Sequence, residues 1–119
     1  MAVKNAVAKA WTILPSYDGL LYSAYQGGDK PVGAGQAYFS FPPVTNAAGY
    51  RLYSRTALEV GNYDQAVGSG TDMGNTQVAG RVVYVKSGLP AGLTYFAITS
   101  YDSDGYESDF STELSKTIT

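Results

Sequence analysis

Residues 88–101 read GLPAGLTYFAITSY, and this stretch decides the fold. The turn-forming residues 88–92 are followed by the run from Leu93 to Tyr101, which holds no Gly, Pro, Asn or Asp. Large apolar side chains recur in this run with a period of two, which predicts a β-strand. One face of the strand carries Tyr95, Ala97, Thr99 and Tyr101, and the other carries Phe96, Ile98 and Ser100.

Shorter runs of the same kind predict further strands, at residues 19–25, 36–41, 50–55, 81–85 and 110–118. The run 50–55 places Tyr50, Leu52 and Ser54 on one face, and Arg51, Tyr53 and Arg55 on the other. Residues 61–75 are rich in Gly, Asp, Ser and Asn, and we expect mostly loop there, with a short edge strand near Tyr63. About seven strands with regular turn signals and no convincing core helix predict an all-β fold, an antiparallel β-sandwich.

Composition limits the function. A chain of 119 residues gives one domain, and 45% hydrophobic residues are enough for a core. The formal net charge is -2 with scattered Lys and Arg, which argues against nucleic-acid binding. There is no His and no Cys, so Ser-His and Cys-His catalysis, thiolate or imidazole metal sites and disulfides are excluded. We therefore expect no enzyme activity, no cofactor and, because no apolar run approaches about 20 residues, no membrane span.

Three segments together resemble a fibronectin type III domain of the bacterial or bacteriophage type. They are Tyr38 to Pro43 (YFSFPP), Gly49 to Tyr53 (GYRLY) and the turn and strand from Gly88 to Ile98. The resemblance covers roughly residues 36–118. It implies an immunoglobulin-like sandwich.

The resemblance also assigns structural roles. Phe41 stands where the family usually has Trp, and Tyr50 and Leu52 lie in the third-strand pattern. Leu89 and Tyr95 flank a tight turn, and the resemblance implies that the Tyr95 ring packs on Leu89 while its hydroxyl binds backbone groups at the sheet corner.

The first 18 residues form an N-terminal arm in this interpretation, and the sandwich occupies residues 19–119. The arm fits helical and strand spacing equally well, so its secondary structure stays open. Its apolar side chains fold back on their own sandwich or dock on a neighbouring subunit as an added strand, and we favour the neighbour. They are Val3, Val7, Trp11, Ile13 and Leu14.

The segment 102–109 is acidic and contains an Asp-Gly pair. Carboxylate oxygens suit hard cations, so its acidic residues are weak metal candidates, but a polar hairpin turn is the simpler interpretation and we predict no metal site. These residues are Asp102, Asp104, Glu107 and Asp109. A carboxylate pair for glycoside hydrolysis, drawn from Glu59, Asp64 and Asp72, is rejected because a small sandwich offers no deep cleft.

Eleven Tyr residues exceed what one core needs. Tyr63 and Tyr106 lie in expected loops, where β-propensity explains them less well than a binding role does. We expect both to contact a partner.

These features predict a non-enzymatic structural or interaction module. The favoured setting is a virion, where the chain would be a capsid decoration, tail or fibre subunit, because residues 1–14 lack the apolar stretch of a secretory signal. An extracellular or cell-surface setting is the other possibility. The expected partners are proteins, either copies of the chain itself or a capsid or tail protein. The alternative is a carbohydrate-binding accessory domain of a secreted bacterial enzyme, with polysaccharide as its ligand.

Overall fold

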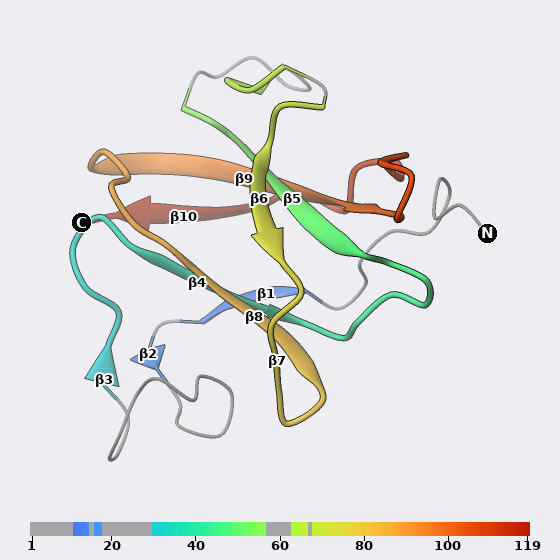
Figure 1. Cartoon of the computed structure of the whole chain (residues 1–119). Coiled ribbons are helices and arrows are strands. Elements are labelled where there is room, and N and C mark those ends of the chain that lie inside the picture. Colours follow the sequence, from blue (N-terminus) through green and yellow to red (C-terminus); the bar gives the residue numbers. More distant parts are fainter. Residues whose placement is uncertain (1–10, 15, 18–29, 57–62, 67) are drawn as a thin grey trace.

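The protein is an all-β sandwich, as predicted. The computed structural model describes residues 11–14, 16–17, 30–56, 63–66 and 68–119. In these ranges there is no helix, and two antiparallel four-stranded sheets pack against each other (Figure 1). The described part of the chain thus contains no helix of the length and apolar character that a membrane span requires.

The chain passes back and forth between the two sheets. One sheet has the order β1 (Thr12–Leu14), β4 (Ala37–Phe41), β8 (Arg81–Lys86), β7 (Gln77–Val78). The other has the order β10 (Leu114–Ile118), β9 (Gly92–Tyr101), β5 (Gly49–Arg55), β6 (Thr71–Gly74). A separate two-stranded ribbon pairs β2 (Ser16–Tyr17) with β3 (Lys30–Pro31). The connections β4–β5, β6–β7 and β8–β9 therefore cross from one sheet to the other.

The core lies between the sheets and is built from the predicted strand faces. Phe39 of β4 meets Phe96 of β9 edge to face, with ring centroids 5.1 Å apart. Phe41 meets Tyr50 in the same way at 4.7 Å. These four rings are fully buried, and burying one such side chain stabilises the fold by about 1.5–3 kcal/mol.

Trp11 belongs to this core. Its ring stacks on Phe39 at 5.8 Å, and its indole N–H donates a hydrogen bond to the Thr112 carbonyl at 2.8 Å. Ile13, in β1, packs on the same cluster, and Leu14 pairs with Tyr38. The preference for docking on a neighbour is therefore corrected for Trp11 and Ile13, because Trp11 is buried in its own sandwich and Ile13 is partly buried against the same core.

Strand β1 lies within the segment assigned to the arm and pairs with β4 as an edge strand of the sandwich, which is the self-packing alternative. Val3 and Val7, and the strand expected at 19–25, lie outside the described residues.

Two of the strand predictions need correction. Tyr63 lies in no strand, and the edge strand is β6, at Thr71–Gly74, inside the segment expected to be loop. Pairing with β5 and burial of Met73, which is 4% exposed, outweigh the poor β-propensity of this segment.

The last strand begins at Leu114 rather than residue 110. Ahead of it, Ser108 and Ser111 run beside β9, and their hydroxyls accept hydrogen bonds from the amides of Ser100 and Ile98, both at 2.9 Å. The amides of Ser108 and Ser111 in turn donate to the carbonyls of Ser100 and Ile98, at 2.7 and 2.9 Å, so the serine hydroxyls replace only the carbonyl acceptors of a regular ladder.

The corner tyrosine is Tyr50, not Tyr95. The Tyr50 hydroxyl accepts a hydrogen bond of 2.7 Å from the Val44 amide, across the connection that carries the chain between the sheets. Tyr95 lies in register with Arg55, whose guanidinium is 4.1 Å from the centre of the Tyr95 ring. Leu89 packs on the core. Since β9 alternates, Phe96 points inward and Tyr95 outward, so Tyr95 does not share a face with Leu89.

Candidate functional site

The outer face of the β10-β9-β5-β6 sheet carries a cluster of aromatic and charged side chains. Strand alternation in β5 sends Arg51, Tyr53 and Arg55 to this face, as the sequence predicted. Loops on either side of the sheet fold over them, so that Tyr53 is only 1% exposed although it points away from the main core. This arrangement forms a second, smaller packing centre.

Three rings form the apolar part of this centre. Phe110 meets Tyr53 edge to face at 5.0 Å and meets Tyr63 at the same distance with a tilt of 43°. Tyr63 also lies 6.1 Å from Tyr53. Tyr63 is thus half-buried against its own chain rather than projecting from a loop.

On one side of the rings, Glu107 is the hub of the polar contacts, because its carboxylate accepts hydrogen bonds from two hydroxyls. Its Oε1 accepts hydrogen bonds from the Tyr53 hydroxyl and the Thr99 hydroxyl, each at 2.7 Å. Arg51 Nε lies 3.8 Å from the same oxygen. Burial raises the pKa of Tyr53, and the hydrogen bond to Glu107 raises this pKa further. Glu107 is therefore occupied in holding β5 and β9 together.

Glu113 plays the same part on the other side. Arg55 binds it with two hydrogen bonds, Nε to Oε2 at 3.1 Å and Nη2 to Oε1 at 2.8 Å. The Tyr63 hydroxyl donates to Oε2 at 2.7 Å. The hydrogen bonds from Arg55 lower the pKa of Glu113, whereas burial and then the bond to Glu113 raise the pKa of Tyr63 to about 12.

The acidic loop is organised as a turn. Asp102 is 4% exposed, and its Oδ1 accepts hydrogen bonds from the amides of Asp104 and Tyr106 at 2.9 and 3.1 Å. Glu107 points to Tyr53 instead, while Asp104 and Asp109 are exposed. The four weak metal candidates are thus separated by the turn. In the described ranges, no three acidic side chains gather in a position to hold a metal ion.

A pocket of about 290 Å³ opens beside the cluster, lined by Tyr53, Thr99, Glu107, Ser108, Asp109 and Phe110. Phe110 is 39% exposed, and Tyr106, four positions earlier in the same loop, is 62% exposed. Two rings and the carboxylate of Asp109 are therefore exposed to solvent in this loop. We call this set, Tyr106, Asp109 and Phe110, the aromatic loop surface.

The sequence singled out Tyr106 but missed Phe110, Glu107 as a hub, and Glu113. One signal was present: Arg51 and Arg55 share a strand face with Tyr53, and such a face needs acidic partners. The periodicity of β5 does not say where in the chain those acids lie.

Fold and site together define a small all-β sandwich with an aromatic and acidic loop surface. No family model, no curated protein and no solved structure matches the chain.

Proposed function

We propose that this protein is a non-enzymatic structural or interaction module that binds a protein partner through the aromatic loop surface. The exposure of Tyr106, at 62%, and of Phe110, at 39%, in one loop carries this proposal. Tyr and Phe supply rigid contact area at low entropic cost, and both are enriched in protein interfaces. The exposed carboxylates of Asp104 and Asp109 favour a partner with basic residues.

The other acidic residues of this face support a binding role rather than catalysis. Glu113 is paired with Arg55 and Glu107 with two hydroxyls, so neither is free to move protons during a reaction. The Arg55–Glu113 pair and Glu107 with its two hydroxyl donors support the exposed loop from below.

The strand order supports an immunoglobulin-like module of the fibronectin type III kind. The orders β1-β4-β8-β7 and β10-β9-β5 correspond to the two sheets of immunoglobulin-type sandwiches, with β6 added at one edge. As the setting we propose a virion assembly, in which the chain serves as a capsid decoration, tail or fibre subunit.

The test compares particles purified from the host or virus that encodes the chain. We compare the wild type with the double variant Tyr106→Ser/Phe110→Ser and with the control Leu93→Ser. Leu93 serves as the control because it is also exposed, at 47%, but lies on β9 away from the loop. We expect the wild type and the control in the particles, and the double variant to be lost from them while Trp11 fluorescence shows it folded.

Two results would contradict the proposal. One is the absence of the wild-type chain from every purified assembly. The other is binding to polysaccharide that depends on Tyr106, which would support the carbohydrate-binding alternative instead.

A further inference from the structure

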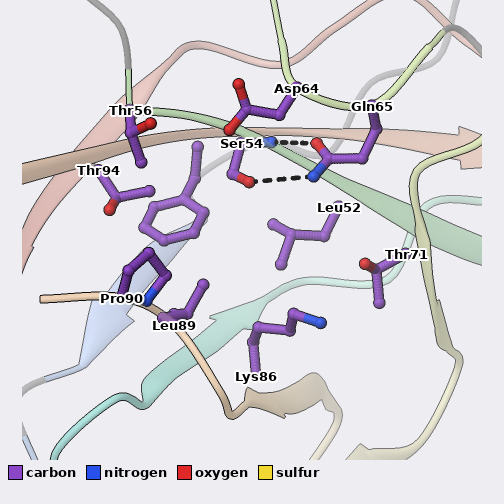
Figure 2. A pocket seen from close by; sticks show the side chains of 11 residues that line it. Leu52, Ser54, Thr56, Asp64, Gln65, Thr71, Lys86, Leu89, Pro90 and Thr94 are labelled. Carbon is purple, nitrogen blue, oxygen red and sulfur yellow. Dashed lines mark hydrogen bonds between the residues drawn. The ribbon is translucent and has the colours of Figure 1, made fainter.

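A second pocket, of about 250 Å³, lies between the two sheets and shares no lining residue with the pocket beside the aromatic loop surface (Figure 2). Its apolar wall comes from Leu52 of β5, Phe96 of β9 and the turn residues Leu89 and Pro90. Its polar residues include Asp64, Lys86 and Thr94. The pocket thus combines a wall of core residues with a polar mouth.

One side of the mouth is fixed by hydrogen bonds to Ser54. The Gln65 side chain accepts from the Ser54 amide at 2.8 Å and donates to the Ser54 hydroxyl at 3.3 Å, as the dashed lines in Figure 2 show. The Asp64 amide donates to the Ser54 carbonyl at 2.7 Å. This network places the exposed carboxylate of Asp64 at the rim and holds the wall in place.

Thr94 contributes an unpaired polar group. It is 1% exposed, and its Oγ1 has no hydrogen-bond partner in the part of the chain that the structure describes. A buried hydroxyl without a partner costs free energy, and such groups are rare in folded proteins. A ligand hydroxyl in the pocket would satisfy this group, since Thr both donates and accepts.

The lining of the pocket carries one negative and one positive side chain, Asp64 and Lys86. Asp64 and Lys86 lie on opposite sides of the pocket, with Leu52 between them in the view of Figure 2. A singly charged ligand would be attracted by one of these two residues and repelled by the other, so the pair favours neither sign of charge. A neutral ligand with several hydroxyls can donate to the carboxylate and accept from the ammonium.

The volume of the pocket and its apolar wall further limit the class of ligand. Pockets for small molecules span about 300–1,000 Å³, so this pocket accommodates a single ring rather than a chain of several. The side chains of Leu52, Leu89 and Phe96 fit the C–H face of such a ring.

We propose that the inter-sheet pocket binds a neutral, polyhydroxylated ring the size of one sugar residue. This site is separate from the aromatic loop surface, and the proposal does not depend on the partner proposed there.

The experiment is an amide chemical-shift titration of the full chain with D-glucose, D-galactose and N-acetyl-D-glucosamine in turn. Acetate and ethylammonium serve as charged probes. We expect at least one sugar to cause saturable shifts at Leu52, Lys86 and Phe96, and none at Tyr106. Thr94→Val, which keeps the shape of the side chain, should weaken binding about tenfold, because one hydrogen bond is lost.

The matched control is Thr117→Val, which makes the same change at an exposed position on β10 and should leave binding unaltered. Asp64→Asn is a second variant, outside the core, that should also weaken sugar binding. The proposal is overturned if no sugar gives saturable shifts, if Thr94→Val and Asp64→Asn both bind like the wild type, or if a charged probe binds more tightly than every sugar.

Discussion

The hydroxyl of Tyr50 offers the sharpest test of how the two sheets are joined. Tyr50→Phe removes one oxygen and keeps the buried ring, with its edge-to-face contact to Phe41. What is lost is the 2.7 Å hydrogen bond from the Val44 amide, in the β4–β5 connection. The resemblance to fibronectin type III domains assigned this role to Tyr95 instead.

The magnitude follows from the burial of the two partners. A hydrogen bond contributes about 0.5–1.5 kcal/mol net, and a buried amide left unpaired costs about 1–3 kcal/mol. Val44 is half-buried, so water replaces the lost acceptor in part. We expect Tyr50→Phe to lower the free energy of unfolding by about 1–2 kcal/mol, which lowers the melting temperature of a domain this size by about 4–8 °C.

The assay is equilibrium unfolding in urea, followed by the fluorescence of Trp11. This is the only Trp in the chain and lies stacked on Phe39 in the core. The matched control is Tyr95→Phe, which removes the same atom from the outer face and should change the free energy of unfolding by less than about 0.5 kcal/mol. A Tyr95→Phe loss as large as that of Tyr50→Phe would refute the assignment of the corner to Tyr50.

Three further predictions concern the core and the contacts of Glu113. Trp11→Phe removes the hydrogen bond to Thr112 and leaves a void, so it should cost about 1–3 kcal/mol in urea unfolding followed by circular dichroism; an unchanged midpoint would mean that Trp11 is not in the core. Because Arg55 lowers the pKa of Glu113, the stability from this pair is present above the ordinary Glu pKa of about 4.3 and is lost as the pH falls through the lower folded value. Glu113→Gln should therefore reduce the loss of stability on acidification, and an unaltered pH profile would argue against the pair. The pKa of Tyr63 is raised to about 12, so its contribution is intact below the ordinary Tyr pKa of about 10 and is lost as the pH rises through 12. The difference in phenolate absorbance between the wild type and Tyr63→Phe should show one tyrosine that ionises near 12. Ionisation near 10 would contradict both the burial of Tyr63 and its bond to Glu113.

Much of the fold was predictable because alternation along a strand shows which residues share a face. The alternation in 93–101 predicted that Phe96 and Ile98 share a face, and the structure turns this face inward, where both side chains are fully buried. The same pattern in β5 predicted that Arg51, Tyr53 and Arg55 share a face, which the structure turns outward. Strand β6 could not be predicted, because its pairing with β5 rather than its composition makes it a strand.

The candidate site was predictable only in part. Tyr106 could be recognised, since a large ring in a turn segment has few reasons to be buried, and it is 62% exposed. Tyr63 looked the same in the sequence, yet it is half-buried under Phe110 and bonded to Glu113. The residues next to Tyr63 in the chain predict neither contact.

The sequence by itself determined the class of fold, the faces of the main strands and the exclusion of His- and Cys-based chemistry, because these depend on residue identity and on neighbours two positions apart. Only the tertiary structure decided that Trp11 joins its own core, that Tyr50 rather than Tyr95 holds the corner, and that Arg55 meets Glu113. The physical reason is distance along the chain: Trp11 and Thr112 are separated by 101 positions and Arg55 and Glu113 by 58, and which of such groups meet is fixed by the order and register of strands in the two sheets.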